Sequence, residues 1–229
     1  MTLVAALTPI LVLSAISAYL DATKGMDDRR ANLLLVADAS LDGVEQSINE
    51  ATLMLTLYRD DLTRRRCKKV FNILQDRIVP LANVARFDTE GVATCSAISD
   101  SGWSLPDPEN NARLKRGEKT VRSDTYFSER SGEWLFAILM RLEDEDGEFA
   151  GSAGLELRAE QLAFLSQGDS LPEGVEVALL DDRGESFGSK RFSKIDPNWV
   201  ASVAKAESAE LFVLTGEDGE SLDVVIQPV

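Results

Sequence analysis

The stretch SGEWLFAILMRLEDEDGEFAGSAGLELRAEQL, residues 131–162, decides the fold. Its first run, WLFAILMRL (134–142), is apolar at positions that face both sides of a strand, as in a strand that lies inside a sheet. The acidic run EDEDGE follows, and the Asp146-Gly147 pair within it is a strong signal for a tight hairpin turn. The stretch therefore predicts a hairpin of two antiparallel strands, the first of which lies inside a sheet.

The second strand of this hairpin, FAGSAGLELR (149–158), is rich in small residues. Because successive side chains of a strand point to opposite faces, one face is predicted to carry Phe149, Gly151, Ala153, Leu155 and Leu157. A helix at AEQLAFLSQ (159–167) closes the unit, and GDSLPEG after it reads as a linker. Before the hairpin, VRSDTYF (121–127) is predicted as a further strand, preceded by a loop-rich region at 100–120.

A shorter hairpin pattern occurs twice in the chain. VARFDTEGVATCS (84–96) aligns with VALLDDRGESFGS (177–189), and five of the thirteen positions are identical. The shared Asp and Gly are residues that any hairpin turn favours, which weakens the argument for duplication. The turn EDGE also occurs twice, at 145–148 and 217–220, so two copies of one α+β module are the economical interpretation.

The N-terminal segment LVAALTPILVLSAISAYL, residues 3–20, has no charged residue. As a helix it would span about 27 Å, close to the ~30 Å of a bilayer core. A retained signal anchor (residues 1–20), a cleaved signal peptide and a buried core helix all fit this pattern. The anchor is favoured because no basic region precedes the segment and a small-residue cleavage site is poorly formed.

The next segment, residues 21–62, is predicted as one long helix because it lacks Pro and carries a regular apolar stripe. The stripe repeats with steps of three and four residues and consists of Leu34, Ala37, Leu41, Val44, Ile48, Ala51, Leu55, Tyr58 and Leu62. Such a seam packs either on the chain's own sheet or along a second copy of the helix in a homodimer. A shorter helix follows, with Val70, Leu74 and Ile78 on one face.

The composition excludes several classes of function. The formal net charge is −15, and so acidic a surface repels phosphate backbones, so nucleic acid is not an expected partner. The chain has no histidine, which removes Ser-His-Asp and Cys-His catalysis and most catalytic zinc sites. The run EDEDGE lacks the alternating ligand spacing of a calcium loop, so no metal, cofactor or catalytic residue is predicted.

The only two cysteines, Cys67 and Cys95, are predicted to form a disulfide. They follow an export segment, and exported proteins fold where disulfides form and persist. Two buried free thiols or a redox-sensing pair are the alternatives.

The order of these elements resembles that of a double Cache domain, the PAS-like extracytoplasmic sensor of bacterial transmembrane receptors. The resemblance covers about residues 21–229 and rests on CSAIS after RFDTEG, with Cys67 in the preceding helix, and on the stretch 131–162. It implies an α+β fold, in which a long N-terminal helix is followed by two Cache modules with antiparallel sheets. The membrane-distal module would cover residues 63–167, and the membrane-proximal module residues 168–229, with a second membrane helix beyond Val229.

The cysteine pair and the anchor resemble most closely the sensor histidine kinases of alphaproteobacteria, including the general-stress-response kinases typified by PhyK. The resemblance implies a periplasmic sensory region of such a receptor, with the anchor in the inner membrane and residues from about 21 onward in the periplasm. An exported binding module without signalling, the ectodomain of a chemoreceptor or diguanylate cyclase, and an exported enzyme that uses carboxylates are the alternatives.

Polar and aromatic residues in GWSLP and VRSDTYFSERSGEW are the candidate ligand-binding residues, because loops of this kind cap a Cache pocket. They are Trp103, Arg122, Asp124, Tyr126 and Trp134. Arg122 suits a carboxylate and Asp124 an amine, and both are predicted to share a strand face with Tyr126. The alternative is that the two tryptophans are core residues and the charged residues are solvated.

Overall fold

The computed structural model describes residues 2–166, 175–181, 183–188, 195–206, 210–215 and 221–226, and the side chains of residues 2–27 are not described. The helices are α1 (Thr2–Leu57), α2 (Arg59–Thr63), α3 (Cys67–Leu74), α4 (Pro108–Lys115), α5 (Ala159–Ser166) and α6 (Pro197–Ala206). The strands are β1 (Leu81–Phe87), β2 (Ala93–Ser96), β3 (Thr120–Arg122), β4 (Tyr126–Ser128), β5 (Glu133–Glu143), β6 (Phe149–Arg158), β7 (Leu179–Leu180), β8 (Ser186–Phe187), β9 (Glu210–Thr215) and β10 (Ser221–Ile226).

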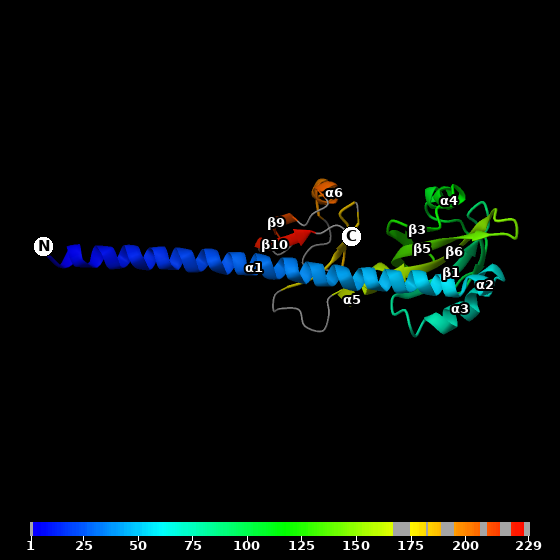
Figure 1. Ribbon diagram of the computed structural model, residues 1–229, viewed down its shortest axis with the longest axis horizontal. Helices are drawn as coiled ribbons and strands as arrows, with labels where there is room; N and C mark the ends of the chain where they lie inside the picture. Colours follow the sequence, from blue (N-terminus) through cyan, green and yellow to red (C-terminus); the bar gives the residue numbers. More distant parts are fainter. Residues whose placement is uncertain are drawn as a thin grey trace.

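Six strands form the main sheet, which is antiparallel throughout. The strand order is β2-β1-β6-β5-β3, and β4 also pairs with β5. The predicted hairpin is confirmed: β5 and β6 pair along their length, and β5 has a partner on each side, as its apolar faces indicate. α1 and α3 contribute to the core on one face of the sheet, and α4 lies over the other face (Figure 1).

The long helix is confirmed, and α1 runs past the sheet and on toward the N-terminus (Figure 1). It ends at Leu57 rather than near residue 62, because a turn at Tyr58 separates it from the short α2. The predicted anchor, residues 1–20, lies outside the part whose side chains are described. Within the described part, none of the helices combines the length and the apolar character that crossing a bilayer needs.

The apolar seam of the long helix packs on the chain's own sheet. Val44, Ile48, Ala51 and Leu55 are each 3% exposed or less and belong to the same core as β5 and β6. Toward the N-terminus the same seam leaves this core, and Leu34 is 41% exposed. These four residues therefore pack against the chain's own sheet and not against a second copy of the helix.

A β-bulge in β6 overturns the prediction for Phe149. Leu142 pairs with Gly151 but Glu143 pairs with Phe149, so Ala150 is an extra residue in β6. An extra residue moves the side chains before it to the other face of the sheet. Phe149 therefore packs in the cluster under α4, whereas Ala153, Leu155 and Leu157 pack under α1.

Two further elements differ from the sequence predictions. The segment 121–127 is not one strand but two, since β3 ends at Arg122 and β4 begins at Tyr126. The region 100–120 is not only loop, because α4 begins at Pro108. Its start carries a clear local signal: the side chain of Asp107 accepts the N–H of Glu109, and proline is favoured at the first helical position.

Beyond α5 the described segments form two short hairpins, β7–β8 and β9–β10, and α6. Ile195, Val203 and Ile226 make a small core there. The two hairpins form separate two-stranded sheets in the described segments, so the second Cache module stays a prediction. The predicted linker and the second EDGE turn, at 217–220, lie outside the described residues.

Candidate functional site

A pocket of about 220 Å³ lies on the α4 side of the main sheet. Its lining comes from residues 105–107, Asn110 of α4, the segment 123–126, two residues of β5 and Arg183. The part of the lining from β5, Ala137 and Leu139, is apolar, and the polar lining residues come mainly from the loops. A mostly apolar wall with a few polar groups is the usual construction of a small-molecule site.

The segment 123–126 lies at the break between β3 and β4. The hydroxyl of Ser123 donates to the carbonyl of Asp124 at 2.7 Å and accepts the N–H of Ala137 at 2.8 Å. The serine therefore fastens the segment to β5 where a continuous strand would have used its own backbone. The carboxylate of Asp124 is left at the exposed edge of the pocket.

Arg183 reaches the pocket from the turn between β7 and β8. Its guanidinium donates to Oδ2 of Asp181 from Nε at 3.0 Å and from Nη2 at 2.8 Å. Nη2 also donates to the carbonyl of Thr125 at 2.9 Å, and the Thr125 hydroxyl donates to Asp181 Oδ2 at 2.9 Å. Burial raises the pKa of Asp181, but hydrogen bonds from Arg183, Glu185 N–H and Thr125 outweigh it and hold this pKa below the ordinary value.

A buried polar cluster lies beside the pocket around Glu156, whose side chain is 4% exposed. Its Oε1 accepts the hydroxyl of Tyr126 at 2.6 Å and lies 3.3 Å from Nη2 of Arg130, and its Oε2 accepts Nδ2 of Asn83 at 2.8 Å. Burial and the Glu156 charge both raise the pKa of Tyr126. The phenol therefore stays protonated and acts as a hydrogen-bond donor to the carboxylate.

Trp103 stacks on this cluster. The Arg130 guanidinium lies 3.5 Å from the centre of the Trp103 ring, a cation–π contact. Trp103 also packs against Phe87 in an edge-to-face arrangement, with the two ring centres 5.0 Å apart. The indole Nε1 is buried and has no hydrogen-bond partner among the described residues.

Two of the five predicted ligand residues, Asp124 and Tyr126, line the pocket. Trp103 lies in the adjoining cluster. The prediction that Arg122 shares a face with Tyr126 is wrong, because Arg122 pairs with Ile138 and Tyr126 with Leu135, which carry side chains to opposite faces.

Trp134 does not line the pocket, but the guanidinium of Arg183, which does, lies 5.7 Å from the centre of the Trp134 ring. Trp134 packs against Phe127 and Phe187, at ring distances of 5.8 and 5.5 Å. Sequence reasoning missed Arg183 and Thr125. A hairpin turn with the pattern Asp-x-Arg-Gly gives no local sign of which distant loop it will meet.

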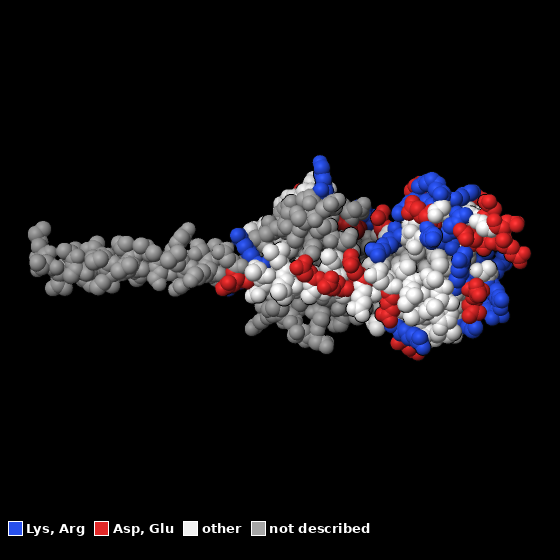
Figure 2. Space-filling model, in the orientation of Figure 1, with Lys and Arg blue, Asp and Glu red and all other residues white. Residues whose placement is uncertain are grey.

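The predicted disulfide is present between Cys67, at the start of α3, and Cys95 of β2. It closes the sheet edge onto α3, and Cys67 is fully buried. The basic residues around Cys67 are in part neutralised, since Asp61 bridges Arg66 and Lys69 at 3.0 Å each. Figure 2 shows charges of both signs mixed over this end of the molecule rather than one basic patch.

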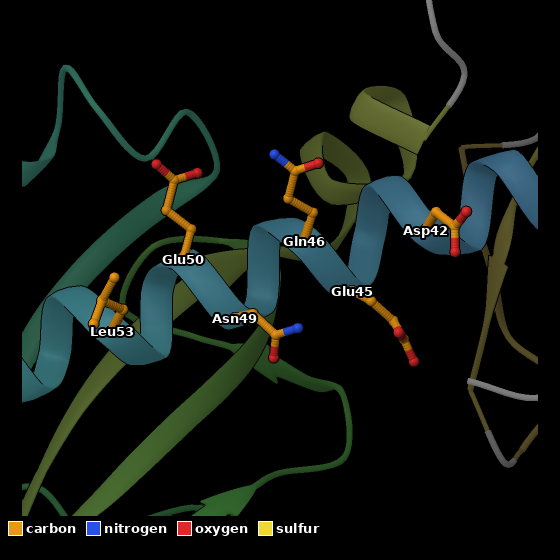
Figure 3. A pocket seen from close by; sticks show the side chains of 6 residues that line it. All are labelled: Asp42, Glu45, Gln46, Asn49, Glu50 and Leu53. Carbon is orange, nitrogen blue, oxygen red and sulfur yellow. The ribbon is translucent and has the colours of Figure 1, made fainter.

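A second hollow, of about 500 Å³, lies along the outer face of α1. All its lining residues belong to this one helix, and they are Asp42, Glu45, Gln46, Asn49, Glu50 and Leu53. Figure 3 shows Gln46 and Glu50 projecting to one side of the helix and Glu45 and Asn49 to the other. Without converging groups, this surface is a poorer candidate than the smaller pocket at the sheet.

Comparison with solved structures places the fold among extracellular sensory domains. The chain is similar to the extracellular domain described as that of a histidine kinase, rpHK1S-Z16, with a TM-score of 0.56, 18% identity and 84% of each chain covered. It is also similar to the ligand-binding domain of the Campylobacter jejuni chemoreceptor Tlp3, solved with L-norvaline (TM-score 0.56, 13% identity, 85% of this chain and 84% of that one).

A third similar structure is the ligand-binding domain of the Pseudomonas aeruginosa chemoreceptor PctB with L-Gln, at a TM-score of 0.55 and 14% identity, with 82% of this chain and 80% of that one covered. No family model and no curated protein matches the sequence. At these identities the likeness establishes a Cache-like fold shared by kinase and chemoreceptor ectodomains.

Proposed function

We propose that the chain is the periplasmic sensory region of a transmembrane signalling receptor, and that a small molecule binds in the pocket between α4 and residues 123–126. The pocket is the observation that carries this proposal. It combines an apolar wall with converging polar groups on the sheet face opposite α1. The likeness to extracellular domains of histidine kinases and chemoreceptors supports the same function.

We further propose that the ligand carries a cationic group. The charged residues of the lining are Asp107, Asp124 and Arg183. Arg183 is already paired with Asp181, so its charge is compensated, whereas Asp124 has no ion pair within the described residues. The remaining negative charge favours an amine that lies against Asp124.

A thermal-shift series tests the ligand class with three probes of equal size: n-pentylamine, n-pentanol and butyrate. The amine at ten times its Kd is expected to raise Tm by ~3–6 °C, since saturation to that degree stabilises by about 1.4 kcal/mol. Asp124→Asn is expected to remove the shift. Asp76→Asn, at an exposed position after α3, is the matched control and is expected to keep it.

An equal shift with pentanol would contradict the role of Asp124, and a shift with butyrate alone would reverse the proposed charge of the ligand. The receptor class is tested separately by the coding sequence after Val229. A second apolar helix followed by a kinase, cyclase or chemoreceptor segment supports the receptor, and a stop codon would favour a binding module without signalling.

The homodimer through the N-terminal helix also stays a proposal. Since the seam from Val44 to Leu55 is used within the chain, a dimer needs apolar residues that remain exposed on α1. Leu53 and Leu57 are 55% and 64% exposed and lie one turn apart. A mass that stays monomeric at all concentrations, with the N-terminal segment present, would exclude the dimer.

A further inference from the structure

We propose that the turn at residues 181–184 is the contact through which the C-terminal segment senses whether the pocket is occupied. This inference rests on the proposed function, because it gives the same pocket its route of signal output. The turn supplies Arg183, and the rest of the described pocket lining comes from residues 105–139. A ligand in the pocket therefore contacts both parts of the chain at once.

The polar joint between the two parts is centred on Thr125, beside the apolar contact of Trp134 with Phe187. The Thr125 hydroxyl donates to Asp181 Oδ2 at 2.9 Å, and its carbonyl accepts Nη2 of Arg183 at 2.9 Å. The residues on either side of it, Asp124 and Tyr126, both line the pocket. A ligand that shifts the backbone at Asp124 or Tyr126 therefore also displaces Thr125, which makes both hydrogen bonds of the joint.

The turn is held together by hydrogen bonds of its own. Three of its hydrogen bonds are internal: Asp181 Oδ1 accepts the N–H groups of Arg183 and Glu185, and the Asp181 carbonyl accepts the N–H of Gly184. These bonds, and the Asp181–Arg183 ion pair, do not depend on Thr125. Docked and undocked positions of an intact turn are the kind of two-state element that a ligand can bias.

On the side away from Thr125, the turn is connected through Ile195 to β10, the last described strand. The carbonyl of Gly184 accepts the N–H of Ile195 at 2.8 Å. A Cβ added to Gly184 would lie only 2.0 Å from the carbonyl oxygen of Ile195, so the two backbones are in direct contact. Ile195 packs with Val203 and with Ile226 of β10. A displacement of the turn is therefore transmitted by direct packing to β10, which lies beside α1.

Amide hydrogen exchange on the whole chain tests the joint without any ligand. Thr125→Val keeps the side-chain shape but removes the donor to Asp181. Exchange in residues 179–187 and 221–226 is expected to become ~10-fold faster, while Thr120→Val at an exposed position of β3 leaves it within twofold. Unchanged exchange in Thr125→Val would overturn the proposal.

Coupling to the pocket is tested by filling it. Ala137→Val adds two methyl groups to the pocket wall and is expected to change amide hydrogen exchange in residues 179–187. In a double variant that also carries Thr125→Val, no such change is expected. The same change in both backgrounds would overturn the proposal. n-Pentylamine provides a second route if the filled variant does not fold, with the same expected change in exchange and the same loss of it in Thr125→Val.

The two proposals fail in different ways. Amine binding that leaves exchange in residues 179–187 unchanged would overturn the joint and leave the proposed function standing. A Thr125-dependent response to Ala137→Val without amine binding supports the joint and contradicts only the proposed ligand class.

Discussion

At the scale of single residues, the buried carboxylate of Glu156 shows how the fold holds a charge next to the candidate site. The carboxylate is satisfied by the amide of Asn83 in β1 and by the phenol of Tyr126 and the guanidinium of Arg130, which lie four residues apart. A buried charge needs such partners, because removing one of them leaves the charge partly unpaired at a cost larger than the bond itself contributes. The cluster therefore fixes Tyr126, and with it one wall of the pocket.

Tyr126→Phe is expected to lower the free energy of unfolding by ~1.5–3 kcal/mol, the usual range for a hydrogen bond to a charged group. Urea unfolding measures this loss. Tyr58→Phe is the matched control, since no described hydrogen bond involves the Tyr58 hydroxyl, and its effect is expected to stay within ~0.5 kcal/mol. Equal losses in the two variants would mean that the Glu156 cluster does not hold Tyr126.

At the scale of elements, the bulge in β6 and the disulfide between α3 and β2 shape the main sheet. The bulge brings Gly151 close to β1, and its φ of +106° is one that other residues rarely adopt. The disulfide links β2, the edge strand of the sheet, to α3, which packs on the same face of the sheet as α1. The bulge determines which side chains of β6 reach the α4 face. The disulfide fixes the edge strand β2 to α3.

Gly151→Ala is expected to destabilise the protein by ~2–4 kcal/mol, because the added Cβ would lie 2.2 Å from the Phe87 carbonyl oxygen. Gly132→Ala separates this clash from backbone strain, since Gly132 also has positive φ but no atom within 4 Å of the added Cβ. The control is expected to cost ~1–2 kcal/mol in chemical unfolding. A smaller loss at Gly151 than at Gly132 would rule out the close approach.

Cys67→Ala with Cys95→Ala is expected to lower the free energy of unfolding by roughly 3–4 kcal/mol, the loop-closure value for a sequence separation of 28. The loss is expected in denaturant titrations without reductant. A reductant should bring the wild-type protein down to the same stability and leave the variant unchanged. An effect of reductant on the variant would point to a cause other than the disulfide.

At the scale of the whole molecule, one helix contacts both folded parts, which also meet at the Thr125–Asp181–Arg183 hydrogen bonds and where Trp134 packs on Phe187. α1 packs on the main sheet through its seam and also lies beside β10 (Figure 1). The hydrogen-bonded joint at Thr125 includes a nearly buried carboxylate, that of Asp181, whose side chain is 3% exposed. The stability of this connection should therefore depend on the charge of Asp181.

The pKa of Asp181 lies below its ordinary value of 3.8, so its stabilising effect is complete above that value and lost as the pH falls below it. Thermal unfolding of the wild-type protein and of Asp181→Asn, measured from pH 7 to pH 3, tests this prediction. The difference in stability is expected to be constant from pH 7 to about pH 5 and to shrink below about pH 4. A difference that grows on acidification would contradict the ion pair with Arg183.

The elements whose signals are local can be predicted from the amino-acid sequence. Asp146-Gly147 specifies the hairpin, the three-four spacing from Leu34 to Leu62 specifies the helix stripe, and the order of the elements already indicated a Cache-like sensor. Even α4, which lies in the region predicted as loop-rich, has a local signal in Asp107 and Pro108. Turns, caps and helix stripes depend on residues a few positions apart, so they can be predicted without the fold.

The tertiary structure alone decided the face of Phe149, the partner of the helix seam and the membership of the pocket. Next to the bulge at Ala150, Gly151 lies close to the backbone of Phe87, a contact between segments about sixty residues apart. Arg183 contacts Thr125 across a similar separation, whereas Arg122, only four residues before Tyr126, faces the other side of the sheet. Such choices follow from long-range packing, and no local pattern carries them.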